Sequence, residues 1–169
     1  MTLEQALKRF GITSVWHFTD IENLPSIEEH NLSSLAVIEK EKIKVPHFGA
    51  DDLSHELDKR RRLDKYVHLA FTDDHPMYHV AKSRGSIQKG IWLEIPIEEI
   101  LKEDVLFCDG VANENGAVLR SQDDIADYID FDVLLHGHDF WKRVEARKAE
   151  ILVPNYIEFN KIIGAHYGK

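Results

Sequence analysis

Cysteine and long apolar runs are scarce in this sequence. Its 169 residues include one cysteine, Cys108, which excludes an intramolecular disulfide and a cysteine-rich zinc site and agrees with a reducing compartment. No apolar stretch approaches the length of a membrane span, and residues 2–10 are amphipathic rather than typical of a signal sequence. The sequence therefore predicts a cytoplasmic protein that has no membrane partner.

The familiar catalytic and cofactor motifs are also missing. There is no Gly-x-Gly-x-x-Gly fingerprint, no Walker loop and no Gly-x-Ser-x-Gly elbow. His55-Glu56 lacks the second histidine of a zinc-protease helix, and His136 with His138 lacks an obvious third ligand. We therefore expect no metal site.

Acidic residues outnumber basic ones by 30 to 21, which gives a formal net charge of -9. Nonspecific affinity for nucleic acid comes largely from cations that neutralise phosphates, so this charge argues against a protein that coats duplexes generically. The cations nevertheless gather in two clusters, at 59–65 and 142–148. Each cluster fits either a local anion-binding groove or a solvated helix face.

Short strands interleave with short helices along the chain. A hydrophobic content of 43% is enough for one compact core, so we expect a single domain over residues 1–169. Because regular βαβ spacing is lacking, an α+β fold is favoured over a doubly wound sheet. The expected strands are 14–19, 66–72, 91–95, 105–108, 149–153 and 159–165. The expected helices are 3–10, 20–31, 51–64, 76–84 and 122–129. We also expect a helical turn at 97–101 and loops at 39–50 and 109–116.

One acidic residue lies in what otherwise reads as the opening of a buried strand. Ala149, Ile151 and Val153 alternate with Glu150 and Leu152 at period two, so Glu150 is held on a rigid element. A carboxylate in such a place is costly unless it is solvated, paired or used. An exposed position at a strand edge would explain it without any function.

Other polar residues lie on or beside apolar elements. His17 and Thr19 fall on the first strand, Asn23 at the start of the following helix, and Arg61 ahead of the strand at 66–72. Taken singly, they read as a satisfied core histidine, a cap, a first-turn residue and a surface arginine. Only their combination with Glu150 suggests a site.

Four segments of the chain match a known pattern in order and spacing. They are 16–27, 57–61, 66–71 with Pro76-Met77, and 149–153, and the most specific parts are the His-x-Thr-x-x-x-Asn-Leu opening and the late Ala-Glu-x-Leu-Val. On these residues the chain resembles the DarT family of DNA ADP-ribosyltransferase toxins. One departure is Thr72-Asp73-Asp74-His75-Pro76-Met77, where many relatives have a Pro-Arg-Ser-Pro-Met setting.

The resemblance implies a fold, a donor, an acceptor and a partner. The fold would be ADP-ribosyltransferase-like, with a split mixed β core and flanking short helices that hold NAD in a cleft. The reaction would transfer ADP-ribose from NAD to a base of single-stranded DNA. A macrodomain antitoxin resembling DarG would accompany such a toxin, and the segment from Asp109 to about His138 would recognise the substrate.

The resemblance also assigns roles to residues. It implies catalysis by Glu150 and Arg61, NAD binding by His17, Thr19, Asn23, Leu24 and Arg61, and DNA binding by Asn113, Asn115 and Arg120. From the second basic cluster we also expect Arg143 and Arg147 to bind DNA.

The chemistry fits these side chains as well. Cleaving the nicotinamide bond builds an oxocarbenium-like ribose, which a carboxylate stabilises more in the transition state than in the ground state. Glu150 could also act as general base toward the acceptor, and Arg61 could pair with the pyrophosphate or orient Glu150. RNA or protein as acceptor, hydrolysis to ADP-ribose, and a noncatalytic binding module are the competing hypotheses.

Overall fold

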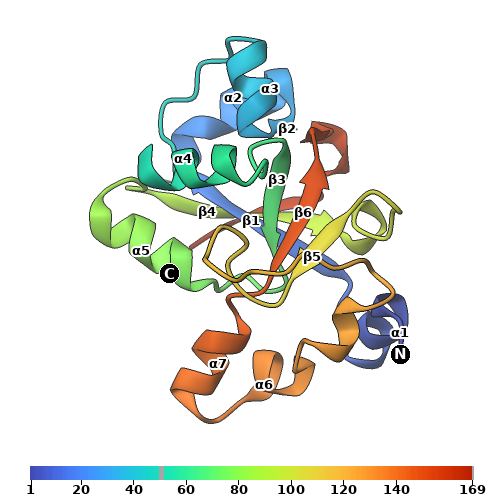
Figure 1. The fold of residues 1–169 in the computed structure, drawn as a ribbon. Coiled ribbons are helices and arrows are strands. Elements are labelled where there is room, and N and C mark those ends of the chain that lie inside the picture. The colour runs from blue at the N-terminus through green and yellow to red at the C-terminus, as the bar shows by residue number, and fades with distance from the viewer. Residues whose placement is uncertain (50–51, 169) are drawn as a thin grey trace.

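A six-stranded sheet forms the centre of the protein (Figure 1). The computed structural model describes residues 1–49 and 52–168. The strand order is β5-β6-β3-β1-β4-β8, and every pairing is antiparallel. The strands are β1 (Ser14–Asp20), β3 (Tyr66–Ala70), β4 (Gly90–Pro96), β5 (Leu106–Cys108), β6 (Glu150–Pro154) and β8 (Gly164–Tyr167), and a separate pair joins β2 (Leu32–Ser33) to β7 (Tyr156–Ile157). The expected α+β class is confirmed, but the described strands are not mixed in direction.

The sheet is weakly joined between its two central strands. β1 pairs with β4 along its whole length, and β3 pairs likewise with β6. Between β1 and β3, by contrast, the register holds a single pair, Trp16 with Ala70. Residues of both strands line one cavity, so this is the split expected for the core.

One face of the sheet packs on the main hydrophobic core. On β3 the residues Val67 and Leu69 point into this core, and Ile151 and Val153 do so from β6. Because successive side chains of a strand point to opposite faces, His68 and Glu150 lie on the other face. The alternation that buries the core therefore presents both polar residues to one side.

The helices gather in groups around the sheet (Figure 1). One group lies at the top of that view and comprises η1 (Ile21–Asn23), α2 (Leu24–His30), α3 (Leu35–Lys40) and α4 (Asp52–Arg60). At the opposite end lie α1 (Leu3–Arg9), α6 (Phe131–His136) and α7 (Phe140–Ala146), while α5 (Pro76–Arg84) lies beside β4. Among the helices of the described residues, none is long and apolar enough to cross a bilayer.

Local signals account for several helix ends. Thr2 and Gln5 form the expected capping box at the start of α1, with each side chain bonded to the other's backbone N–H. Pro76 stands in the first turn of α5, and Gly85 ends that helix in the left-handed conformation, with φ of 79°. Residues 97–101 form the short 3-10 turn η2 (Ile97–Glu99) and its cap.

Two expected elements were wrong. The helix expected at 122–129 is only the 3-10 turn η3 (Ile125–Asp127), because the Ser121 hydroxyl takes the N–H of Asp123 and starts a turn there. The strand expected at 159–165 begins at Gly164, because residues before it form the 3-10 turn η4 (Phe159–Lys161), whose first N–H bonds to the Asn31 side chain.

Other boundaries shift by a few residues. The loop expected at 39–50 starts later, since α3 runs to Lys40. Of the helix expected at 51–64, α4 covers Asp52–Arg60, and Asp51 lies outside the described residues. Helix α6 was not among the expected elements, and its Asp130 cap accepts a hydrogen bond from the N–H of Val133.

Candidate active site

A cavity of about 260 Å³ opens where β1 and β3 separate. Its walls come from β1, β3, η1, α2, α3, α4 and the start of β6. Apolar side chains make up much of the lining, and the polar and charged residues among them are His17, Thr19, Asn23, Ser26, Asn31, Ser33, Ser34, His47, Ser54, His55, Asp58, Asp64, His68, His75, Asn113 and Glu150. A largely apolar cleft with a few converging polar groups is typical of a ligand site.

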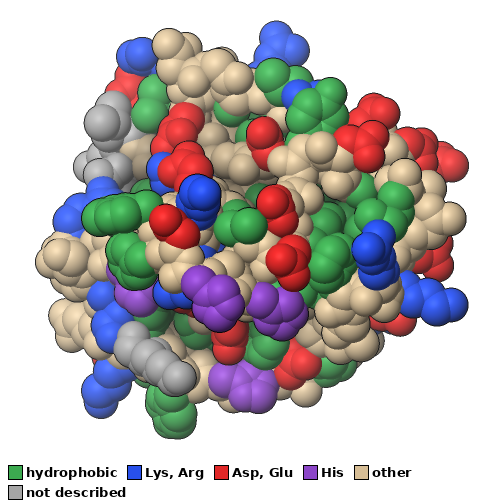
Figure 2. Space-filling view, turned by 90° about the horizontal axis from the view of Figure 1, so that it is seen from below, with side chains coloured by type: hydrophobic (Ala, Val, Ile, Leu, Met, Phe, Trp, Pro, Cys, Tyr) green, Lys and Arg blue, Asp and Glu red, His purple; other side chains and the backbone are tan. Residues whose placement is uncertain are grey.

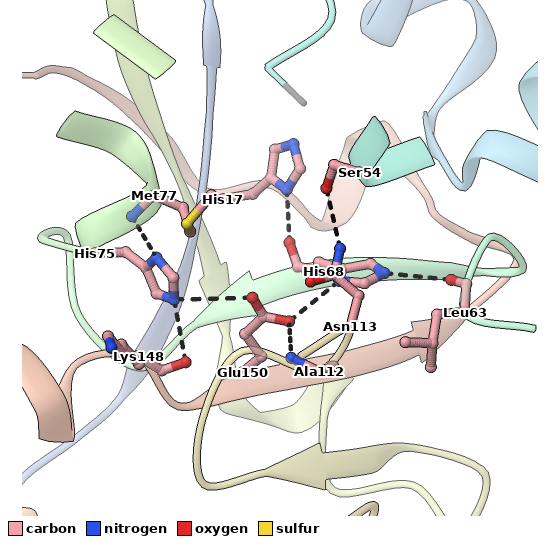
Figure 3. A network of polar contacts seen from close by, with 10 residues as sticks. All are labelled: His17, Ser54, Leu63, His68, His75, Met77, Ala112, Asn113, Lys148 and Glu150. Carbon is pink, nitrogen blue, oxygen red and sulfur yellow. Dashed lines mark hydrogen bonds and ion pairs between the residues drawn. The ribbon is translucent and has the colours of Figure 1, made fainter. Parts of the chain in front are cut away.

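Glu150 lies at the wall of this cavity as the first residue of β6 (Figure 3). The residue is buried, with 8% of its surface exposed. Its Oε2 atom accepts a hydrogen bond from the N–H of Ala112 at 3.2 Å and lies 3.2 Å from His68 Nδ1. Burial opposes ionisation, but the hydrogen bond and charge of His68 and the Ala112 N–H together lower the pKa of this carboxyl. Glu150 is therefore paired rather than solvated.

His68 lies on β3, on the same face as Glu150. Its Nε2 lies 3.2 Å from the carbonyl oxygen of Leu63, so each ring nitrogen faces an acceptor. Burial disfavours the charged ring, but the hydrogen bond and charge of Glu150, the charge of Asp58 and the Leu63 carbonyl outweigh it and raise the pKa of His68 to about 9. At neutral pH the ring is an imidazolium.

His75 approaches the other oxygen of Glu150. Its Nδ1 accepts the N–H of Met77 at 3.1 Å, its Nε2 donates to the carbonyl of Lys148 at 3.2 Å, and the same Nε2 lies 3.9 Å from Glu150 Oε1. One nitrogen accepts and the other donates, which is the pattern of a neutral imidazole. Burial is the main cause that lowers the pKa of His75, although the charge of Glu150 opposes it.

His17 joins the two parted strands. Its Nδ1 donates to the carbonyl of His68 at 2.9 Å, where β3 lacks a paired residue of β1. Burial lowers the pKa of His17 to about 4, the His68 carbonyl raises it, and the His68 charge lowers it further. The ring is neutral at pH 7, and with Nδ1 donating its Nε2 is an acceptor.

Thr19 and Asn23, which the sequence comparison assigns to NAD binding, also line the cavity. The Asn23 amide donates to Thr19 Oγ1 at 2.9 Å and to the carbonyl of His47 at 2.5 Å, and its oxygen accepts the N–H of His47 at 3.0 Å. Asn23 therefore ties the segment after α3 to the end of β1. Leu24, at the start of α2, does not line the cavity.

Arg61 is not among the residues that line the cavity. It follows the last residue of α4, and its side chain is exposed. Asp58, one turn earlier, lines the cavity instead. Burial and the charge of Glu150 raise the pKa of Asp58, while His68 lowers it. In the described residues, the contacts of Glu150 come from His68, His75 and Ala112.

The five residues expected to bind DNA lie in different settings. Asn113 lines the cavity and donates to Ser54 Oγ at 3.0 Å, whereas Asn115 is exposed in the loop beyond it. The Arg120 guanidinium lies 3.3 Å from the centroid of the Tyr128 ring. Arg143 donates to the carbonyl of Gly137, and Arg147 donates to the carbonyl of Leu134 and pairs with Asp74.

Sequence reasoning missed three residues that the fold brings to Glu150. His68 and His75 contact it, and Asp58 influences its charge state through His68. A signal for His68 was available, because at period two it shares a strand face with Ala70, the residue that pairs with Glu150. His75 and Asp58 gave no such signal, since a turn and a helix place them.

One group among the described residues has the spacing of a metal site, namely Asp20, Glu22 and His47. Asp20 is buried, but its carboxylate already accepts the backbone N–H groups of Glu22, Gln88 and Lys89. His136 and His138 belong to no such group in the described chain.

Charges on the surface are mixed in sign. On the face drawn in Figure 2, acidic and basic side chains are both present, and histidines gather near its lower centre. That face carries no broad basic area. This agrees with the net charge of -9.

Comparisons with known proteins agree with this geometry. A family model described as "DarT: ssDNA thymidine ADP-ribosyltransferase, DarT" matches residues 16–165. No curated protein matches the chain.

Three solved structures share the fold. Thermosipho africanus DarTG in complex with ADP-ribose has a TM-score of 0.73 and 22% identity, and the match covers 90% of this chain and 43% of that one. Thermus sp. 2.9 DarT in complex with ADP-ribosylated ssDNA has a TM-score of 0.71 and 19% identity, over 90% of this chain and 79% of that one. The same Thermus protein in complex with NAD+ has a TM-score of 0.62 and 17% identity, over 89% and 79%.

Proposed function

Because the chain belongs to the DarT family of ssDNA thymidine ADP-ribosyltransferases, we propose that it transfers ADP-ribose from NAD to a thymine base of single-stranded DNA. The observation that carries the proposal is Glu150. It is a buried carboxylate on the wall of a cleft, and one oxygen is held by His68 and the Ala112 N–H. A structural acid at a strand edge would need neither the cleft nor the two histidines.

The carboxylate suits the difficult step of the reaction. When the bond to nicotinamide breaks, positive charge develops on the ribose, and a fixed anion facing that charge stabilises the transition state more than the ground state. Because His68 and the Ala112 N–H hold Oε2, the direction of Oε1 is fixed as well. The carboxylate therefore needs little rearrangement when positive charge develops on the ribose. Glu150 is the catalytic residue of the proposal.

The pKa of Glu150 decides how well this residue could also act as a general base toward the acceptor. A general base works best when its pKa lies near the working pH, and the partners of this carboxyl lower its pKa instead. Glu150 is therefore better suited to stabilising the ribose cation than to removing a proton from the base. The proton of the thymine ring would pass to Glu150 only as the new bond forms.

We propose that NAD binds in this cleft and contacts side chains near the end of β1. The Nε2 atom of His17 is an acceptor, and the Thr19 hydroxyl can donate because it accepts from Asn23. We propose that both contact NAD and that Asn23 acts by holding the cleft wall. Leu24 and Arg61 stay predictions, since neither lines the cavity.

The acceptor would be an unpaired base, because the reactive nitrogen of a paired base is hidden in the duplex. Asn113 lies in the cavity and is the best placed of the predicted DNA contacts. Asn115 and Arg120 lie on the loop after β5 and would contact the DNA strand outside the cavity. Arg143 and Arg147 are already bonded within the protein, so we assign them weaker roles.

We also propose that the protein is the toxin of a toxin–antitoxin pair with a macrodomain antitoxin. The support is family membership and the Thermosipho DarTG structure, of which the present chain spans less than half.

A panel of acceptors tests the proposal. Labelled NAD is incubated with the protein and, separately, with single-stranded DNA, the matching duplex, RNA and protein. We expect label on single-stranded DNA alone, and about 100-fold less with Glu150→Gln. Glu158→Gln, at an exposed residue outside the cavity, is the matched control.

The same panel separates the competing functions. Label on RNA or protein instead of DNA would show that the acceptor is RNA or protein. Consumption of NAD without any labelled acceptor would make the protein a hydrolase.

A further inference from the structure

His68 and Glu150 are diagonal neighbours across two paired strands. In the β3–β6 register, His68 lies opposite Leu152 and Ala70 lies opposite Glu150. Side chains two residues apart on a strand share a face, and long ones can reach the diagonal position on the next strand. The contact between the ring and the carboxylate therefore follows from strand register rather than from a flexible loop.

Each ring nitrogen of His68 faces an acceptor (Figure 3). Its Nδ1 lies 3.2 Å from Glu150 Oε2, and its Nε2 lies 3.2 Å from the carbonyl oxygen of Leu63. An ionised carboxylate and a carbonyl can only accept hydrogen bonds. Both contacts are satisfied together when His68 carries a proton on each nitrogen.

The proton between the two groups could formally belong to Glu150, but the surroundings oppose that arrangement. The N–H of Ala112 donates to the same Oε2 atom, which favours the ionised carboxylate. Asp58 on α4 adds a second negative charge near His68, which favours the imidazolium. Two further titratable neighbours add no positive charge: His17 has a pKa of about 4, and His75 accepts at Nδ1 and donates at Nε2 as a neutral ring does.

The two oxygens of Glu150 therefore differ. Oε2 receives two hydrogen bonds, from His68 and Ala112. Oε1 lies 3.9 Å from His75 Nε2, a nitrogen already bonded to the carbonyl of Lys148. Oε1 is the oxygen left for a ligand.

We infer that His68 is a positioning residue that acts through Glu150: as an imidazolium it fixes Oε2 and keeps the carboxylate ionised, so that Oε1 faces the reacting ribose. The inference rests on the proposed function for its effect on rate. The state of the pair itself is independent of any substrate. In this chain the family's expected arginine partner, Arg61, lies outside the cavity lining, and His68 occupies the contact with the carboxylate.

The first arm of the test reads the charge of His68 directly. Nitrogen and carbon chemical shifts of the histidine rings are followed by NMR as pH is raised, in the parent and in Glu150→Gln. The parent ring should be doubly protonated at pH 7 and titrate near pH 9. In Glu150→Gln the midpoint should fall by more than about one pH unit, because the charge and the strongest acceptor are lost. A parent ring that titrates near pH 6.5, the ordinary value for histidine, would overturn the inference.

The second arm reads the effect on rate. His68→Gln keeps a hydrogen-bond donor and removes the charge, and His30→Gln on the exposed part of α2 is the matched control. We expect kcat to fall about 10-fold or more in His68→Gln, while KM for NAD changes by less than about 3-fold. The parent should lose activity above about pH 9, the pKa of His68, and this limb should disappear in the variant. If His68→Gln has the kcat and pH profile of the parent, the inference is overturned, although the proposed function still stands because both proteins modify DNA.

The two arms also distinguish the inference from the proposed function. If the parent modifies no DNA and cleaves no NAD, the function fails while the NMR arm still decides the state of the pair. If His68→Gln does not fold, the titration of the parent and of Glu150→Gln decides in its place.

Discussion

Two histidines in the cavity wall carry different charges although both are half-buried. His68 faces two acceptors and has a pKa of about 9, whereas His17 faces one carbonyl and the His68 cation and has a pKa of about 4. The partners of each ring, rather than burial alone, decide its protonation. The difference leaves one cation beside Glu150 and one neutral acceptor toward the cavity.

The low pKa of His17 predicts a loss of stability in mild acid. An unfolded histidine binds a proton below about pH 6.5, but folded His17 does so only near pH 4. Between these values the proton favours the unfolded state, so the free energy of unfolding falls as pH falls from 6.5 to 4. His75 contributes with the same sign.

His17→Phe tests this statement. Urea unfolding at several pH values should give a shallower decline between pH 6.5 and 4 in the variant than in the parent. The variant should also bind NAD about 10-fold more weakly, because the acceptor on Nε2 is removed. An unchanged slope would contradict the assignment of His17 as a neutral ring with a lowered pKa.

Asn23 gives a second prediction at this scale. Asn23→Ala removes the hydrogen bonds to Thr19 and to both backbone groups of His47. We expect a loss of about 1–3 kcal/mol in the free energy of unfolding and weaker NAD binding, since the cavity wall is released. Asn160→Ala, at an exposed residue of η4, should change neither quantity. Equal effects of both variants in urea titration and calorimetry would refute this role.

At the scale of elements, one buried carboxylate joins the end of β1 to the start of β4. Asp20 accepts the N–H groups of Glu22, Gln88 and Lys89 at 3.0, 2.8 and 3.1 Å and is 1% exposed. Burial opposes its ionisation, but these N–H groups and the charge of His47 lower its pKa. This contribution to stability is therefore present at neutral pH and is lost as pH falls through the folded pKa.

Asp20→Ala should lower the free energy of unfolding at pH 7 by about 3 kcal/mol, because three backbone N–H groups lose their acceptor. Asp20→Asn retains one oxygen and should lose clearly less. Urea unfolding of both variants decides the matter, and an alanine variant as stable as the parent would show that water replaces the carboxylate.

The sequence predicts elements well where apolar residues repeat regularly. The strands around Val67, Leu93 and Ile151 and the capped helix at Leu3 follow such patterns. It fails at η3 and η4, where side chains of Ser121 and Asn31 take backbone N–H groups and divert the chain. Helix α7 gave no signal, because none of its residues is fully buried.

The same reasoning explains what could be predicted of the site. Glu150 stands out because it breaks an apolar alternation, and His17 and Thr19 stand out through motif spacing. His75 and Asp58 acquire their roles only when a turn and a helix meet β6, which spacing along one segment does not encode. Arg61 was predicted from position in a motif and lies exposed after α4.

At the scale of the whole molecule, the net charge of -9 limits how DNA is held. Each phosphate neutralised adds about -0.7 to the slope of log affinity against log salt for a single strand. Arg147 is paired with Asp74, and Arg120 lies over a tyrosine ring. We expect few phosphate contacts and therefore a slope shallower than about -3.

Fluorescence anisotropy of a labelled single strand at increasing salt measures this slope. A much steeper slope, typical of a protein that neutralises six or more phosphates, would contradict the expectation. Binding would then depend on a basic surface and not chiefly on contacts of the base within the cavity.

The central claim is that Glu150, held by His68, serves transfer of ADP-ribose to a thymine base. The most direct measurement is mass spectrometry of a mixed-sequence single strand after reaction with NAD, with the modified nucleotide located by fragmentation. The account predicts one ADP-ribose on thymidine with the parent protein and about 100-fold less of this product with Glu150→Gln under the same conditions. ADP-ribose on another nucleotide, or equal modification by Glu150→Gln, would contradict it.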